Sequence, residues 1–149
     1  MTKAFRFAFL PLLSMLVLTG CGDGDREARL KAAGPNPSLD ALMRVANADA
    51  GGKTFGQCLA CHTIGKGELD RGGPNLHGIM GKPVAGGSER FGYTAALMRV
   101  GGRWDRATMD RWLTSPQRFA PGTRMTFAGL PDPLARADVI AYLEREGRE

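Results

Sequence analysis

The chain has 149 residues, with 20 Lys and Arg against 15 Asp and Glu, so its formal net charge is +5. This length has room for one domain with short flanking segments, and a positive charge this small, without a basic run, argues against nucleic-acid binding. Gly occurs 21 times, which favours a fold rich in loops over one of long regular helices.

Residues 1–20 have the pattern of a bacterial export signal peptide. Lys3 and Arg6 precede an apolar run from Phe7 to Leu18, which is shorter than the roughly 20 residues of a membrane-spanning helix. Leu18-Thr19-Gly20-Cys21 resembles the lipobox of bacterial lipoproteins, in which the Cys is lipidated and becomes the acylated N-terminus. We therefore expect lipidation at Cys21 and a protein anchored on the periplasmic side of a bacterial membrane. The alternatives are ordinary secretion with a stray Cys and an uncleaved N-terminal helix.

The next segment, residues 21–46, is expected to be a flexible tether between the lipid and a compact domain at 47–149. Residues 22–37 are rich in Gly, Pro and charges of both signs, and they have too few apolar side chains to fold alone. A flexible stretch of about 16 residues has a root-mean-square reach of roughly 20–25 Å. Ser38 is placed to cap a short helix after it, which either packs on the domain or extends the tether.

Helices are predicted at four places within the domain: about 49–58, about 93–100, after an N-cap at Asp105, and 134–146 after an N-cap at Asp132. No segment alternates as a strand does, so the expected fold class is all-α, with a few helices and long loops. Loops of such length need a bulky apolar cofactor to complete the core.

Cys58-Leu59-Ala60-Cys61-His62 is a C-x-x-C-H sequence, the attachment motif of c-type haem. In that chemistry two thiols add across the two haem vinyl groups, and the adjacent His becomes an axial ligand of the iron. The motif therefore predicts one covalent haem c, attached at Cys58 and Cys61, with His62 as a metal ligand. A thioredoxin-like redox pair would need a preceding strand, and a zinc site would need two more ligands where only His77 remains.

A second axial ligand must come from His77 or from a methionine. Gly73–Gly78 and Pro121–Gly129 resemble the two loops that follow the haem motif in mitochondrial-type class I cytochrome c, and the resemblance extends over about 100 residues, from Ala50 to Leu143. By this resemblance the fold is that of class I cytochrome c, and the second iron ligand is Met125. His77 is then a surface residue, and core packing accounts for Met80, Met98 and Met109.

The resemblance also implies roles for other residues around the haem. The carbonyl of Pro74 would accept a hydrogen bond from the ring of His62 and fix its tautomer. Tyr93 and Trp104 would donate to one haem propionate, Lys82 would offset its charge, Thr123 would lie beside the other propionate, and Phe127 would shield the haem edge. The last helix would cross the first one where Gly51 permits a close approach.

Three places depart from the family pattern. Trp112 stands where the family usually has a Tyr, Asp70 and Arg71 replace part of a basic loop, and Pro131-Asp132-Pro133 replaces a Lys-rich run. The cations left to dock a partner are Lys66, Arg71, Arg118 and Arg124, together with Lys53.

An iron with both axial positions filled cannot readily bind a substrate, so we expect a single-electron carrier and not an enzyme. The expected partners of this monomer are redox proteins of a respiratory or photosynthetic chain, such as a cytochrome bc-type complex and a terminal oxidase or other reductase. Two other functions stay open: a fixed haem subunit of a dehydrogenase or oxidase, and a sensor or peroxidase-like protein in which Met125 leaves the iron.

Overall fold

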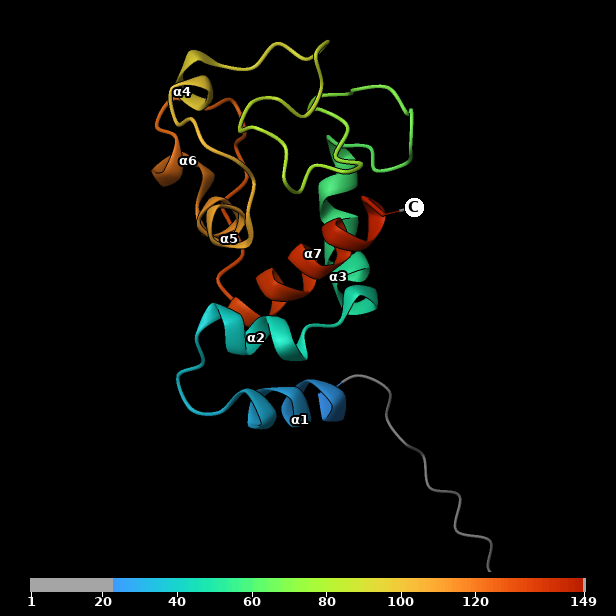
Figure 1. The fold of residues 1–149 in the computed structure, drawn as a ribbon, viewed down its shortest axis with the longest axis vertical. Coiled ribbons are helices and arrows are strands. Elements are labelled where there is room, and N and C mark those ends of the chain that lie inside the picture. Colours follow the sequence, from blue (N-terminus) through green and yellow to red (C-terminus); the bar gives the residue numbers. More distant parts are fainter. Residues whose placement is uncertain (1–22, 149) are drawn as a thin grey trace, which may run out of the picture.

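The computed structural model describes residues 23–148, so the predicted signal peptide and the lipidation site at Cys21 lie outside the described residues. Helices joined by long irregular segments make up this part of the chain (Figure 1). They are α1 Asp23–Ala33, α2 Leu39–Val45, α3 Ala48–Phe55, the 3-10 helix η1 Gly56–Ala60, α4 Ala95–Met98, α5 Arg106–Thr114, α6 Pro116–Phe119 and α7 Pro133–Glu146. The all-α prediction is confirmed. None of the helices in this range is long and apolar enough to cross a membrane.

The predicted crossing of the first and last helices of the domain is confirmed as a contact between α3 and α7. A Cβ atom at Gly51 would lie 2.0 Å from the backbone oxygen of Asp138 in α7, so only Gly permits this approach. Beside it the ring of Phe55 lies 5.1 Å from the ring of Tyr142, and Phe55 is 1% exposed. Because η1 continues directly from α3, this crossing fixes the start of the C-x-x-C-H motif.

Three helices begin at the residues predicted to cap them. Ser38 Oγ accepts from the N–H of Ala41 at 3.2 Å, Asp105 Oδ1 from Thr108 at 2.7 Å, and Asp132 Oδ1 from Leu134 at 3.0 Å. The short helix α6 is not predicted from the sequence, although Pro is favoured at the first helical position.

The N-terminal segment differs from the predicted flexible tether. Residues 23–33 form α1, which lies with α2 at the end of the molecule away from α4 and α6 (Figure 1). Leu30 and Ala33 of α1 pack against the buried cluster of Leu42, Leu134 and Ala137, which α2 and α7 supply. The tether prediction is wrong because the segment was considered without the rest of the fold. The few apolar side chains of the segment pack against α2 and α7.

A buried ion pair adds to this packing. Arg29 Nη1 donates to Asp138 Oδ1 at 2.7 Å and to the backbone oxygen of Val45 at 3.3 Å. The same carboxylate oxygen accepts from the backbone N–H of Asn47 at 2.8 Å. Because the side chains of Arg29 and Asp138 are 14% and 6% exposed, water screens the pair poorly. Asp138 therefore joins α1, the start of α3 and α7.

Candidate functional site

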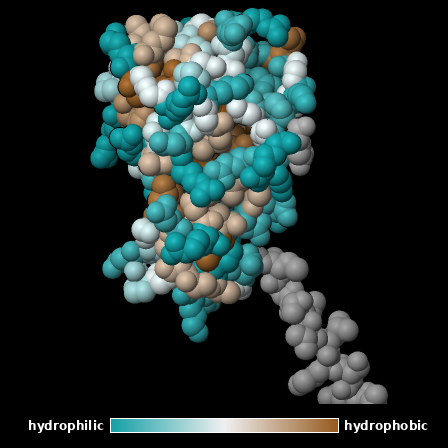
Figure 2. All heavy atoms as spheres, in the orientation of Figure 1, coloured by the Kyte–Doolittle hydropathy of each residue, from teal (hydrophilic) through white to brown (hydrophobic). Residues whose placement is uncertain are grey.

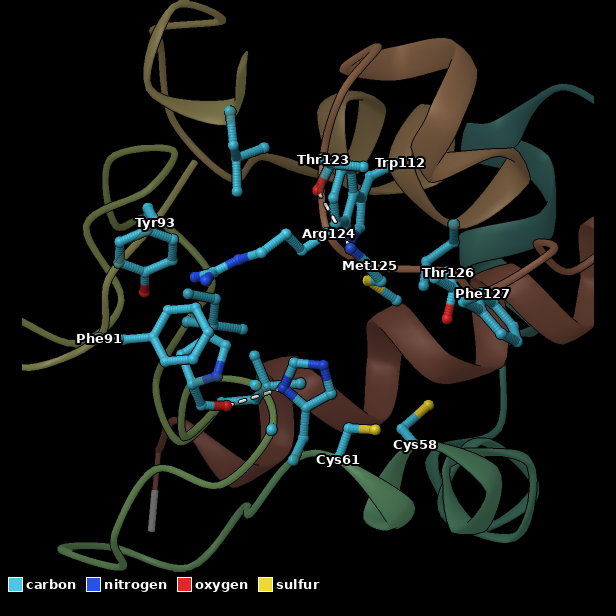
Figure 3. A pocket seen from close by; sticks show the side chains of 18 of the residues that line it. Cys58, Cys61, Phe91, Tyr93, Trp112, Thr123, Arg124, Met125, Thr126 and Phe127 are labelled. Atoms are coloured by element: carbon cyan, nitrogen blue, oxygen red, sulfur yellow. Dashed lines mark hydrogen bonds between the residues drawn. The ribbon is translucent and has the colours of Figure 1, made fainter. Parts of the chain in front are cut away.

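A cavity of about 340 Å³ lies between the C-x-x-C-H motif and the segment 121–129 (Figure 3). All nine residues predicted to contact the cofactor line it: Cys58, Cys61, His62, Pro74, Tyr93, Trp104, Thr123, Met125 and Phe127. Most of the other lining side chains are apolar, and they include Leu76, Ile79, Phe91, Leu97, Met109, Trp112 and Leu113. The fold thus gathers the predicted site residues around one apolar space.

His62 is oriented by the segment 73–74. Its Nδ1 lies 2.8 Å from the carbonyl oxygen of Pro74, and because a carbonyl can only accept, Nδ1 carries the hydrogen. The lone pair of the imidazole is then on Nε2, the tautomer that a metal ligand needs. Burial lowers the pKa of His62, against the opposing effect of the Pro74 hydrogen bond. Gly73 leaves space for the ring, since a Cβ atom there would lie 2.3 Å from His62 Cε1.

Cys58 lies in the 3-10 helix η1, and Cys61 follows directly at its C-cap. The backbone oxygen of Cys58 accepts from the N–H of Cys61 at 3.0 Å and from that of His62 at 2.9 Å, which folds the five-residue motif into a single turn. Both cysteines are free, and burial raises the pKa of the Cys58 thiol to about 11. Each sulfur faces the cavity in Figure 3.

Met125 enters the cavity from the segment 121–129, on a different wall from the cysteines (Figure 3). Gly122 and Gly129 have φ angles of 93° and 105°, a left-handed conformation that suits Gly. A Cβ atom at Gly129 would also lie 2.1 Å from the backbone oxygen of Thr114. These glycines let the segment turn tightly at both ends, so that Met125 faces inward.

Two polar side chains that also line the cavity are Tyr93 and Arg124. Tyr93 Oη accepts from the N–H of Ser88 at 3.0 Å, which leaves its own hydrogen free to donate. Arg124 is the only Lys or Arg of the described residues that lines the cavity, and its guanidinium donates to the backbone oxygen of Gly92. Lys82 was expected beside a propionate, but it does not line the cavity. Its ammonium donates to the backbone oxygen of Gly87 at 3.1 Å, whereas Arg124 lines the cavity itself.

These donors fit a c-type haem. The cavity combines two free thiols, an imidazole with its Nε2 lone pair available, a thioether and an apolar lining, which together match covalent attachment and axial ligation.

Comparison with known proteins decides the family. The chain is 38% identical over 133 residues to a cytochrome c homolog of Bradyrhizobium diazoefficiens, covering 89% of this chain and 71% of that protein. The chain belongs to the cytochrome c family. It is also 44% identical over 97 residues to cytochrome c2 of Rhodoblastus acidophilus, covering 65% of this chain and 90% of that one. Among solved structures, cytochrome cH of Methylobacterium extorquens matches with a TM-score of 0.63 and 38% identity, over 67% of this chain and 99% of that one. No family model matches the chain.

As a cytochrome c, the protein carries covalently bound haem c with its iron, and it is an electron carrier that works with redox partner proteins, not an enzyme. The two attachment thiols of the motif are Cys58 and Cys61. The remaining assignments, including His62 and Met125 as iron ligands, are predictions that the geometry of the cavity fits.

This cytochrome c also relies on a carboxylate that the motifs do not reveal. Asp70 Oδ1 accepts from the N–H of Asn75 at 2.7 Å, and its Oδ2 accepts from the hydroxyl of Ser88 at 2.6 Å. The bond from Ser88, followed by the bond from Asn75, lowers the pKa of Asp70. Asn75 is next to Pro74 and Ser88 supports Tyr93, so Asp70 connects two walls of the cavity.

The methionines are only partly as expected. Met109 is 4% exposed and lies in the core, as predicted. Met98 is 57% exposed, so the prediction that it packs in the core is wrong. Helix α4 has only four residues, and it turns Leu97 inward instead.

Proposed function

We propose that this cytochrome c is a single-electron carrier held by a lipid at Cys21 on the periplasmic side of a bacterial membrane. His62 and Met125 are the axial ligands of its iron. It takes electrons from a cytochrome bc-type complex and passes them to a terminal oxidase or another reductase. The observation that carries the proposal is one apolar cavity into which an imidazole, a thioether and two thiols all project.

The residues around the cavity support electron transfer over catalysis. A haem held there supplies a one-electron couple between ferric and ferrous iron. The hydrogen bond from His62 to Pro74 keeps the imidazole in one orientation, and the 121–129 segment brings Met125 to the lining of the same cavity. With both axial positions occupied, no site is left for a substrate. The apolar lining and the charge of Arg124 both disfavour the more positive ferric state, which favours a high reduction potential.

The charges next to the cavity indicate the kind of partner. Arg124 lines the cavity, and Arg71 donates to the backbone oxygen of Leu59, inside the attachment motif, at 3.4 Å. Both side chains belong to exposed residues. Such cations attract an acidic surface on a redox partner, and the rate of association should fall as the salt concentration rises.

The test of the iron site is the visible spectrum of the reduced, haem-loaded protein with and without carbon monoxide. A low-spin spectrum that carbon monoxide does not change is the expected result, because Met125 occupies the sixth position. A rapid shift on adding the gas would exclude a closed site and would favour a sensor or peroxidase-like function.

The test of the anchor is Cys21→Ser in the full chain, expressed in a bacterium that processes lipoproteins. The wild-type protein should be found in the membrane fraction with the added mass of the lipid. The variant should lose both the added mass and the membrane association. A variant that stays in the membrane fraction would refute the lipid anchor.

A fixed haem subunit is the second candidate, because residues 23–33, predicted to belong to a flexible tether, form the docked helix α1. A permanent interface would need a broad apolar surface. On the face shown in Figure 2, apolar residues form only small groups among hydrophilic ones. The large apolar residues exposed within residues 23–148 are Leu59, Leu69, Met98 and Val100. This pattern favours the carrier, and constant co-purification with one enzyme would favour the subunit.

A further inference from the structure

The side chain of Gln117 holds the segment that carries Met125. Its amide nitrogen, Nε2, donates to the backbone oxygen of Thr123 at 3.0 Å and to the backbone oxygen of Met125 at 2.9 Å. An amide nitrogen has two hydrogens, so both bonds form at once and both must come from the nitrogen. The two acceptors lie on either side of Arg124.

The rest of the segment has few supports of this kind. Within residues 124–129, the carbonyl of Met125 is the only backbone oxygen for which the described part of the chain provides a hydrogen-bond donor. The N–H of Met125 has a longer contact, 3.4 Å, with Thr123 Oγ1. The backbone around Met125 therefore depends on Gln117 for its main polar contact.

Gln117 is itself placed by a rigid element. It follows Pro116, which is fully buried, in the single turn of α6. Two residues on, the ring of Phe119 stacks on that of Trp104 with their centroids 5.9 Å apart. The amide thus projects from a well-packed turn onto a segment that makes few backbone contacts.

We infer that Gln117 is a positioning residue for Met125, which clamps the 121–129 segment closed and thereby keeps the sixth position of the iron occupied. The inference rests on the proposed role of Met125 as a ligand. When the two hydrogen bonds are lost, the segment opens more often, and each opening exposes the iron to an external ligand. Gln117 acts on ligand exchange, through the backbone, without touching the iron.

The test is the rate at which carbon monoxide binds to the reduced, haem-loaded full chain. Gln117→Glu keeps the shape of the side chain and replaces the donor nitrogen by an acceptor, so both hydrogen bonds are lost. We expect carbon monoxide binding to become faster by on the order of tenfold or more, from the usual strength of two hydrogen bonds. The far-red absorption band of Met-ligated ferric haem should weaken at the same time.

Arg118→Gln is the matched control, because it changes the net charge by the same one unit on the neighbouring residue of α6. Arg118 is exposed, and no side-chain hydrogen bond to it occurs within residues 23–148. The control should bind carbon monoxide as slowly as the wild type. Gln117→Ala removes the donor without adding a charge, so it should also bind carbon monoxide faster than the wild type. This variant keeps the clamp testable if Gln117→Glu folds poorly.

Met125→Ala separates failure of the clamp from failure of the ligand. If this variant binds carbon monoxide rapidly while both Gln117 variants stay within twofold of the wild type, Met125 is the ligand and the clamp is refuted. If Met125→Ala itself leaves binding and the far-red band unchanged, Met125 is not the ligand, and both the clamp and the proposed iron site are refuted.

Discussion

Replacing Arg29 by Met tests whether α1 is an integral part of the fold. Met keeps much of the length of the side chain but removes the charge that faces Asp138. The carboxylate, whose side chain is 6% exposed, would keep only the N–H of Asn47 as a partner in the described structure. Removing one partner of a buried ion pair costs about 3–5 kcal/mol, because the other charge is left without compensation.

The loss of stability in Arg29→Met is limited because α1 can undock from the rest of the protein. If α1 undocks, water reaches Asp138, and the loss becomes that of the ion pair plus the contacts of the half-buried Leu30 and Ala33. Burying a whole Leu side chain contributes about 1.5–3 kcal/mol, and Leu30 is only half-buried. We therefore expect the free energy of unfolding to fall by about 2–3 kcal/mol.

Urea denaturation of the haem-loaded full chain, followed by circular dichroism, measures this loss. The control is Arg26→Met, since Arg26 lies 2.8 Å from Asp132 but the two side chains are 44% and 35% exposed. That exposed pair should contribute at most about 0.5 kcal/mol. Arg29→Met/Asp138→Asn should recover much of the loss, because no charge is then buried alone. If Arg29→Met costs no more than Arg26→Met, the argument from burial is wrong.

Three further predictions concern the close contacts of Gly73 and Gly51 and the carboxylate of Asp70. Gly73→Ala should prevent normal haem ligation, because its Cβ would lie 2.3 Å from the imidazole, whereas Gly72→Ala, whose nearest contact is 3.7 Å, should yield ordinary spectra. Gly51→Ala should lower the melting temperature by several degrees, because its Cβ would meet a carbonyl oxygen of α7 at 2.0 Å. Asp70 has a lowered pKa in the folded protein, so its contribution to stability is present above about pH 4 and is lost as the pH falls through the folded pKa. Ser88→Ala removes the main cause of that shift, so acid denaturation should begin at a higher pH than in the wild type.

The local features of this fold are readable from the sequence because they depend on neighbouring residues. Ser38, Asp105 and Asp132 cap helices through hydrogen bonds that span two or three residues, and a capping side chain needs no distant partner. The C-x-x-C-H motif is similarly local, since Cys58 lies in η1 and Cys61 is its C-cap. The nine predicted site residues come from segments far apart in the sequence, and all of them line one cavity. Their grouping could be predicted only because the chain resembles class I cytochrome c.

The features that sequence reasoning missed depend on contacts that no sequence pattern marks. Arg29 and Asp138 are separated by 109 positions, and nothing in either neighbourhood marks them as a pair. Gln117 reaches two backbone oxygens, and backbone acceptors leave no residue signature. The resemblance placed Lys82 near a propionate, and it gave no sign that its ammonium would donate to the carbonyl of Gly87. Only the assembled fold reveals such pairings.

If the protein is lipidated at Cys21, as we propose, the docking of α1 would also change how it meets its partners. For a chain acylated at Cys21, only Gly22 separates the lipid from the first residue of α1. Such a domain would be held closer to the bilayer than one on a flexible tether of about 16 residues, so its cavity would sample a smaller range of heights. Part of the translational entropy that association usually costs would then be lost on anchoring, before any encounter. Partners whose own redox centres lie within that range of heights would be favoured, so height above the membrane would help to select them.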